Sequence, residues 1–340
     1  MKLGLVGKPL SGKKTVFEAL TKSESAGRHK NENRIAAIRV PDDRVDTLTR
    51  MYKPKKTVYA QIEYSLGKQQ EGARGKTSPW GILSDCDALV HVVRNFPIPG
   101  EEPPAPYRDI LSLDEEMMLS DLVIAETRLE RMEADKKRGK KPDPTEAELL
   151  ARVKEMLENG IPIRNDMELA ASPVLRGFSF ASAKPVLVLV NNGDEDTDLP
   201  DGSPPEGMEM MVIRGRLEHE ISRMPEEDAK EFLKEFGIEE PVTHRAIRKS
   251  YQLLGLISFF TVGEDEVRAW TIKKGTPAVE AAGVIHSDMQ KGFIRAEVVS
   301  YDDLIDAGSY AEARKRGTVR LEGKTYPMKD GDIVSFRFNV

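Results

Sequence analysis

The sequence predicts an α/β protein in which a three-layer domain with a mostly parallel sheet precedes a small α+β domain. Two observations predict the first domain: short apolar runs alternate with helical stretches, and a glycine-containing loop joins the first run to the first helix. A third observation, the loss of strand signals between residues 113 and 160, predicts that an antiparallel helical hairpin is inserted into it.

The first domain begins with an expected strand at residues 3–6, a loop and a helix at about residues 13–20. Further strands are expected at residues 35–40, 57–64, 88–93, 186–190 and 210–213. Several of these runs are continuously apolar rather than alternating, which is typical of strands covered by helices on both faces.

The inserted hairpin is predicted from apolar residues that recur at steps of three and four, the spacing of a helical seam. These residues are Met118, Leu122, Ala125, Leu129 and Met132 in the first helix, and Leu149, Val153, Met156 and Gly160 in the second. Asp143 is expected to cap the second helix, with Pro144 in its first turn and Glu146 three residues on. The tip between the helices is basic, and its cationic residues are Lys136, Lys137, Arg138, Lys140 and Lys141.

Two more helices are expected at residues 225–236 and 244–255, before the composition changes. Strand signals at residues 268–272, 293–299, 318–321 and 333–338 then surround one helix at residues 277–285. This pattern predicts a small α+β domain over residues 258–340.

Composition restricts the function classes. The chain has 340 residues, a net charge of −6 and one cysteine, Cys86. A disulfide partner is excluded, and any RNA contact would need a local basic patch. No apolar run reaches the roughly 18 residues of a membrane span, so a cytoplasmic protein without a membrane partner is expected.

A phosphate-binding loop is predicted where Gly7 to Lys13 fit the pattern G-x-x-x-x-G-K between a strand and a helix. Glycines let backbone N–H groups curl around a phosphate, and the helix N-terminus and Lys13 add positive potential. A glycine-rich turn without a ligand is the alternative. The expected phosphate-binding residues are Gly7, Pro9, Leu10, Ser11, Gly12, Lys13, Lys14 and Thr15.

Lys14 departs from the motif. The position after the motif lysine normally carries Ser or Thr, because that hydroxyl binds Mg²⁺. A charged lysine has no lone pair for the metal and repels it.

The chain resembles the YchF family of Obg-like ATPases over essentially its whole length. The residues that carry the resemblance are the phosphate loop and the C-terminal stretches 267–272, 281–288, 291–296, 329–332 and 336–340. The resemblance implies a Ras-like G domain (residues 1–112 and 173–257), an inserted helical hairpin (113–172) and a TGS domain (258–340). It also implies ATP rather than GTP as ligand, and ribosome or RNA binding through the hairpin tip and the TGS domain. For the tip, a solvated loop remains the alternative.

The resemblance also indicates which family residues are missing. The Mg²⁺-contacting Thr of the first switch falls near Lys30, by counting back from the stretch Val40 to Arg44. The Asp of the second switch is replaced by Tyr64, and Glu63 would point to the other face of its strand. No histidine follows Tyr64 before residue 84, where the family has one proposed to assist hydrolysis.

Base recognition is expected at two loops. Asn191, Asn192 and Asp194 occupy the positions of the N-K-x-D motif of GTPases, which is N-x-x-E in the YchF family. Arg214 and Gly215 stand where a small-residue loop usually lines the base pocket.

The first hypothesis is a pseudo-NTPase that binds ATP or GTP, with Mg²⁺ weak or absent and little or no hydrolysis. No catalytic residue and no metal ligand is predicted. One alternative is an active ATPase that recruits Thr15, Glu63 or Asp194 for new roles. The other is a ribosome- or RNA-binding adaptor with an empty pocket.

Overall fold

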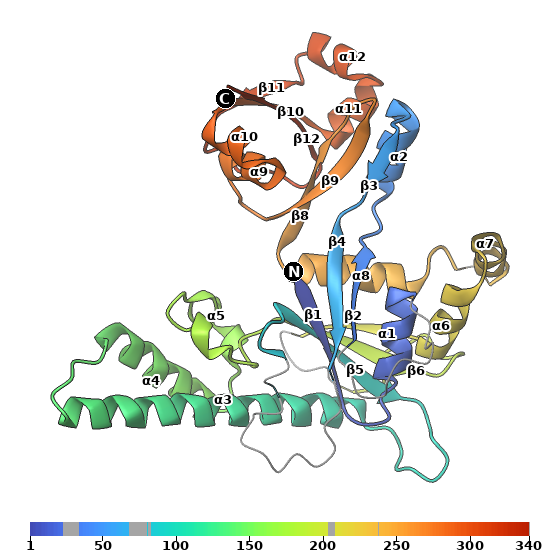
Figure 1. Cartoon of the computed structure of the whole chain (residues 1–340). Helices are drawn as coiled ribbons and strands as arrows, with labels where there is room; N and C mark the ends of the chain where they lie inside the picture. The colour runs from blue at the N-terminus through green and yellow to red at the C-terminus, as the bar shows by residue number, and fades with distance from the viewer. Residues whose placement is uncertain (23–33, 68–79, 81–82, 203–207, 237, 340) are drawn as a thin grey trace. The chain divides into compact units, whose positions relative to one another are not determined.

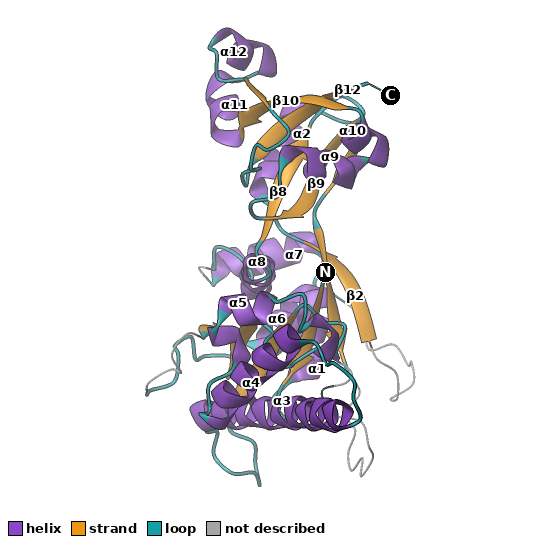
Figure 2. Ribbon diagram, turned by 90° about the vertical axis from the view of Figure 1, so that its left-hand side faces the viewer, coloured by secondary structure: helices purple, strands orange, loops and turns teal. Residues whose placement is uncertain are grey.

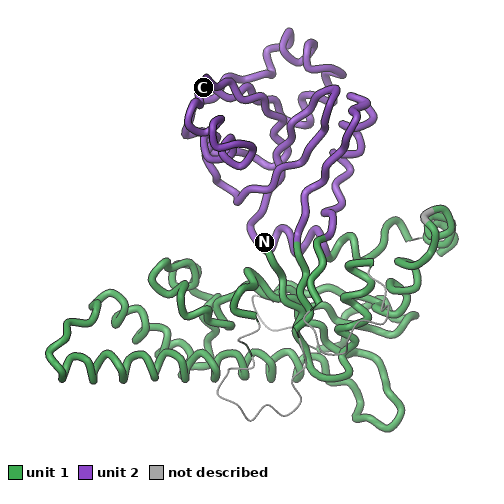
Figure 3. Tube along the Cα trace, viewed as in Figure 1, with its two compact units in different colours: residues 1–37, 63–246 green, residues 38–62, 247–340 purple. Residues whose placement is uncertain are grey.

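The computed structural model describes residues 1–22, 34–67, 80, 83–202, 208–236 and 238–339. The chain divides into two compact units (Figure 3), one of residues 1–37 and 63–246 and the other of residues 38–62 and 247–340. Among the described helices, none is long and apolar enough to cross a membrane.

The first unit is built on a mostly parallel sheet (Figure 1), as predicted. Its strands lie in the order β2-β4-β1-β5-β6-β7. β1 pairs in parallel with β4 and β5, and β6 pairs in parallel with β5 and β7. The bounds are β1 Lys2–Val6, β2 Arg34–Arg39, β4 Gln61–Leu66, β5 Ala88–Asn95, β6 Val186–Asn192 and β7 Glu209–Ile213.

Helices cover both faces of this sheet, which explains its continuous apolar strands. All seven residues of β6 are buried. On one face, Val186, Val188 and Val190 join a cluster with Ile110 and Met117 of α3 (Pro106–Lys137). α1 (Lys13–Thr21) packs against β1 and against α6 (Gly215–Arg223).

The helical hairpin is formed by α3 and α4 (Pro144–Glu158), which pack along each other (Figure 2). Its core contains the predicted seam residues Met118, Ala125, Met132 and Val153. Leu150 and Leu157 are buried there as well, because the apolar stripe of α4 is wider than the predicted one. Asp143 caps α4 by accepting a hydrogen bond from the Thr145 amide at 2.9 Å.

Three details of the hairpin differ from the prediction. Gly160 lies exposed beyond the end of α4 with a φ of 69°, so it is a turn residue rather than a seam residue. Glu146 binds Arg128 of α3, with oxygen–nitrogen distances of 2.6 and 2.9 Å. α3 continues through Lys137, so Lys136 and Lys137 lie in its last turn rather than in the tip loop.

The second unit has a mixed sheet of order β11-β10-β12-β8-β9-β3 with short helices. Its strands are β3 Lys56–Val58, β8 Leu256–Thr261, β9 Glu266–Lys273, β10 Phe293–Ser300, β11 Arg320–Glu322 and β12 Asp332–Phe338. Its helices are α2 Asp43–Tyr52, α9 Ala278–Ile285, α10 Ser287–Lys291, α11 Tyr301–Ala307 and α12 Tyr310–Lys315. Phe259, Ala282 and Val298 contribute to a core beneath α9.

The predicted single strand at residues 57–64 is wrong, because the structure forms two strands there. β3 pairs in parallel with β9 of the second sheet, whereas β4 pairs with β1 of the first sheet. Residues 38–62 accordingly group with the C-terminal part of the chain. The predicted domain boundaries remain a prediction. They assign residues 38–62 to the G domain, whereas the structure groups these residues with the C-terminal part of the chain.

Three further α-helices complete the described part of the fold, two of them close to the predicted positions. α7 spans Glu226–Glu235 and α8 spans Val242–Leu253, near the helices expected at residues 225–236 and 244–255. α5 (Met167–Ala171) follows the hairpin and was not predicted. Its Leu169 is buried in the same core as the hairpin seam.

Candidate nucleotide-binding site

The predicted phosphate loop connects β1 to α1, and two glycines fix its path. Gly7 has a φ of 145° and Gly12, which precedes α1, has a φ of 86°. A Cβ at Gly7 would lie 2.2 Å from the carbonyl oxygen of Val92, and a Cβ at Gly12 would lie 2.3 Å from Nδ2 of Asn191. Both positions therefore require glycine for their backbone angles and for their close neighbours.

Lys13 is folded over this loop. Its ammonium donates hydrogen bonds to the carbonyl oxygens of Gly7 at 2.7 Å and Lys8 at 2.6 Å. Burial without a carboxylate partner lowers the pKa of Lys13 to about 8. The cation is thus held at the loop, where an anion would be its natural partner.

Lys14 lies along α1, away from the loop. Its Nζ is 4.0 Å from Oε1 of Glu18, and its side chain is 67% exposed. Glu18 also accepts a 2.7 Å bond from Arg34 and lies 3.5 Å from Nε2 of His219. The buried Glu18 carboxylate is therefore the centre of a cationic cluster to which Lys14 belongs.

The rest of the loop shows two features that the motif does not predict. Leu10 has a φ of 63° and its side chain is exposed, so it is a loop-tip residue. Ser11 is buried, and its hydroxyl is among the buried polar atoms that have no hydrogen-bond partner in the described part of the chain. Pro9 is exposed and Thr15 is half-buried.

Asn191 links the phosphate loop to the loop before α6. Its buried amide donates to the Ser11 carbonyl at 3.0 Å and accepts from the Gly215 amide at 2.9 Å. Gly215 is needed at this contact, because a Cβ there would lie 2.7 Å from Oδ1 of Asn191. Of the residues predicted to bind the base, these two hold the site together.

Asn192 shapes the loop that follows β6. Its amide donates to the carbonyl oxygens of Asp196 at 3.3 Å and Asp198 at 2.7 Å. It also accepts a 2.9 Å bond from Asn95, at the end of the neighbouring strand β5. Asn192 is buried and is thus committed to the loop itself.

Asp194 and Arg214, the remaining predicted base-binding residues, lie close together. Arg214 donates to the backbone oxygen of Asp194 at 3.2 Å. The Asp194 carboxylate lies 3.8 Å from Nε of Arg216, a residue that the sequence prediction did not assign to the site. The signal that could have identified Arg216 is its place two positions after Arg214, at the start of α6.

The described residues around the loop do not fit a magnesium ion. Lys14 stands at the sequence position of the usual hydroxyl residue and directs its ammonium toward Glu18, and Tyr64 is fully buried within β4. Lys30 lies outside the described residues. No group of three or more His, Cys, Asp or Glu side chains that could hold a metal ion occurs among the residues that were placed. Thr15 provides the remaining hydroxyl in the first turn of α1.

The basic hairpin tip lies in the same unit, at the junction of α3 and α4. Lys136, Lys137, Arg138, Lys140 and Lys141 are all exposed. Lys140 pairs with Asp135 at 3.0 Å. The other four side chains have no ion pair within the described part of the chain.

Known proteins align with this chain over nearly its whole length. Residues 256–339 match the family described as "YchF-GTPase_C: Protein of unknown function (DUF933)". The chain is 36% identical to "Ribosome-binding ATPase YchF" of Bacillus subtilis (strain 168), an alignment that covers 99% of both chains. This chain belongs to the YchF family of Obg-like ATPases.

Two further YchF-family comparisons agree. The chain is 35% identical to "Obg-like ATPase 1" of Caenorhabditis elegans, over all of this chain and 92% of the relative. A solved structure, "Structure of the Schizosaccharomyces pombe YchF GTPase", matches with a TM-score of 0.83 and 29% identity, over 99% of this chain and 97% of that one. The match confirms the predicted fold class, a P-loop G domain with a C-terminal domain, for this YchF-family chain.

Proposed function

We propose that this YchF-family chain binds ATP in preference to GTP, works with the ribosome and hydrolyses the nucleotide little or not at all. The observation that carries the proposal is the position of Lys14, which replaces the hydroxyl of the motif and lies 4.0 Å from Glu18. The phosphate loop keeps its glycines and Lys13, so an anion can still be held. The loop lacks the Ser or Thr hydroxyl after Lys13 that usually binds Mg²⁺.

The loss of magnesium ligands argues for weak hydrolysis. In a nucleotide site the metal offsets the charge on the β- and γ-phosphates. Loss of one such stabilising contact in the transition state typically costs about 3 kcal/mol, or roughly a hundredfold in rate. Tyr64 is fully buried and cannot take the place of the missing acid. Lys13 can stabilise a bound phosphate but does not orient an attacking water.

Preference for adenine is supported by the surroundings of Asp194. In GTPases the Asp of the base motif accepts hydrogen bonds from guanine. Here that carboxylate has Arg216 at 3.8 Å, and Arg214 holds its backbone oxygen. The Arg216 guanidinium competes with guanine for this carboxylate, which weakens the contact that distinguishes guanine from adenine.

Ribosome binding is supported by relatives and by charge. The Bacillus subtilis relative is named a ribosome-binding ATPase. The exposed tip residues of the hairpin provide a local basic patch on an otherwise acidic chain, as contact with RNA phosphates requires.

An active ATPase is the second candidate, and the names of the relatives favour it. In that case Thr15, one position after Lys14, would supply the missing hydroxyl. The third candidate is an adaptor with an empty pocket. It is favoured by the Lys13 ammonium, which already donates hydrogen bonds to two carbonyl oxygens of its own loop.

Single-turnover hydrolysis of ATP by the wild-type chain and by Lys14→Ser separates these candidates. The proposal expects no turnover above background in the wild type, and a magnesium-dependent rate in Lys14→Ser. Magnesium-dependent hydrolysis by the wild type that is lost in Thr15→Val would instead establish the active ATPase. Absence of ATP binding by both chains at millimolar concentration would establish the adaptor.

A further inference from the structure

The second unit contains a cavity of about 790 Å³ that the proposed function does not use. Its walls are mainly apolar, and they include Val40, Pro41, Tyr251, Leu256, Ile257 and Met328. These residues come from three separate parts of the sequence, and all of them belong to the same compact unit. The volume lies within the range of ordinary small-molecule sites, which are apolar with a few polar groups.

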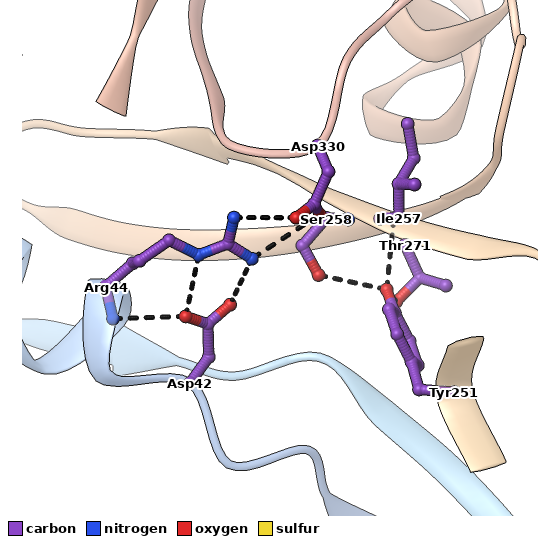
Figure 4. A network of polar contacts seen from close by, with 7 residues as sticks. All are labelled: Asp42, Arg44, Tyr251, Ile257, Ser258, Thr271 and Asp330. Atoms are coloured by element: carbon purple, nitrogen blue, oxygen red, sulfur yellow. Dashed lines mark hydrogen bonds and ion pairs between the residues drawn. The ribbon is translucent and has the colours of Figure 1, made fainter. Parts of the chain in front are cut away.

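One side of the cavity is a network of satisfied charges around Arg44 (Figure 4). The guanidinium donates to the Asp42 carboxylate at 2.8 and 2.9 Å and to the Asp330 carboxylate at 2.7 Å. Its face lies 5.1 Å from the ring centre of Phe260. Asp330 also accepts the Ser258 amide at 2.8 Å. The two acids thus share one guanidinium, which holds them in place and leaves the network with one negative charge in excess.

Tyr251, which also lines the cavity, is equally fixed. The hydroxyl of Tyr251 is bonded to the Ile257 carbonyl and to the hydroxyls of Ser258 and Thr271, at 3.1, 3.0 and 3.0 Å (Figure 4). Since its polar end is fully used, Tyr251 offers the cavity only its apolar surface. The cavity is therefore lined by residues whose positions do not depend on a ligand.

The remaining charges around the cavity are mostly positive. Lys274 and Lys329 line it and are exposed, and Lys329 interacts electrostatically with Asp332. Arg248 adds a third cation, and Asp43 is the one lining acid outside the Arg44 network. An anionic group would meet the two lysines, while Asp43 could accept hydrogen bonds from hydroxyls.

We propose that this cavity binds a nucleoside monophosphate, with its base against Tyr251 and Met328 and its phosphate at Lys274 and Lys329. The apolar walls suit a flat ring, and the lysines suit a phosphate. Asp43 suits ribose hydroxyls, which a fatty acid or a simple organic acid lacks. The nucleotide can be free or can be the terminal residue of an RNA strand, since both present the same chemistry.

Photocrosslinking of the full chain with 8-azidoadenosine 5′-monophosphate, followed by peptide mapping, tests this proposal. It is carried out in the wild type and in Lys13→Ala, so that the phosphate loop cannot produce the signal. The result expected is labelling within residues 248–258 or 327–330 in both chains. Labelling confined to the phosphate loop, or no labelling, would overturn the proposal and leave the proposed function untouched.

Charge variants provide the matched control. Lys274→Glu with Lys329→Glu should weaken binding about tenfold or more, because two exposed contacts to phosphate become repulsive. Lys273→Glu with Lys324→Glu changes two neighbouring exposed lysines that do not line the cavity, and should leave binding within about twofold. Equal loss in the two pairs would overturn the site. Competition by AMP alone identifies the free nucleotide, and competition also by a short RNA identifies a strand end.

Discussion

The side-chain amide of Asn191 donates a hydrogen bond to the carbonyl oxygen of Ser11 at 3.0 Å. The same side chain accepts the Gly215 amide at 2.9 Å, so one buried residue at the end of β6 fixes both the phosphate loop and the start of α6. Asn191 thus holds the two loops of the candidate nucleotide site at a set separation.

Asn191→Ala should therefore destabilise the fold. It leaves the Ser11 carbonyl and the Gly215 amide buried without partners, at about 1–3 kcal/mol each. The expected loss is roughly 2–6 kcal/mol in urea unfolding monitored by circular dichroism. Asn159→Ala is the control, since Asn159 is exposed and bonds only to Glu155 in its own helix. A loss no larger than that of the control would contradict the role assigned to Asn191.

Gly12→Ala should be more costly than Gly160→Ala. Both glycines have positive φ, 86° and 69°, so each substitution brings a similar backbone strain of about 1 kcal/mol. At Gly160 the added Cβ meets nothing within 4 Å, whereas at Gly12 it would lie 2.3 Å from Nδ2 of Asn191. The difference in unfolding free energy measures that clash, and equal losses would show that the loop relaxes around it.

Binding of a nucleotide should be accompanied by proton uptake above pH 8. Burial lowers the pKa of Lys13 to about 8, and a phosphate beside the ammonium raises it again. Near pH 9 the free site is mostly deprotonated and the bound site protonated, so about one proton is taken up. Calorimetry of ATP in buffers of different ionisation enthalpy measures this uptake. Lys13→Met should abolish it, and its persistence in that variant would assign it to another group.

The lowered pKa of Lys13 also makes the stability of the nucleotide-free protein depend on pH. The pKa of Lys13 is lower in the folded chain than in the unfolded one, so the unfolded state binds more protons between about pH 8 and 10. The penalty for burying the charged lysine is fully present below pH 8 and is relieved as the pH rises through that range. Lys13→Met should flatten this part of the stability profile relative to the wild type.

Neutralising the hairpin tip should weaken ribosome binding and reduce its dependence on salt. Replacing Lys136, Lys137, Arg138 and Lys141 by Gln removes the four tip cations without an ion pair among the described residues. Co-sedimentation with ribosomes over a range of salt concentrations measures the effect, since each lost phosphate contact lowers the slope by about one. Arg223→Gln with Lys234→Gln is a control of exposed cations outside the hairpin and the TGS domain. Unchanged co-sedimentation of the tip variant would leave the tip a solvated loop.

Local patterns predicted the parts of the fold that depend on neighbours in sequence. The strand and helix around the phosphate loop, the Asp143 cap and most of the hairpin seam are of this kind. The break between β3 and β4 was missed, because which sheet a short strand joins depends on distant partners such as β9. Short helices such as α11 and α12 were missed because they are too brief to show a period.

For the candidate site, too, the sequence predicted what depends on neighbouring residues and missed what depends on distant ones. The motif located Gly12 and Lys13, whose backbone path and position follow from the loop itself. It could not place Lys14, because Glu18 is shared with Arg34 and His219, which come from distant segments. Nor could it reveal that Asn191 bridges two loops or that Arg216 lies beside Asp194.

The central claim is that this site holds a nucleotide without depending on magnesium. Titration calorimetry of ATP with the wild-type chain, with saturating magnesium and with chelator, tests it most directly. We expect measurable binding in both conditions, with Kd values that agree within about threefold, less than 1 kcal/mol. Binding that tightens about tenfold or more when magnesium is added would contradict the account.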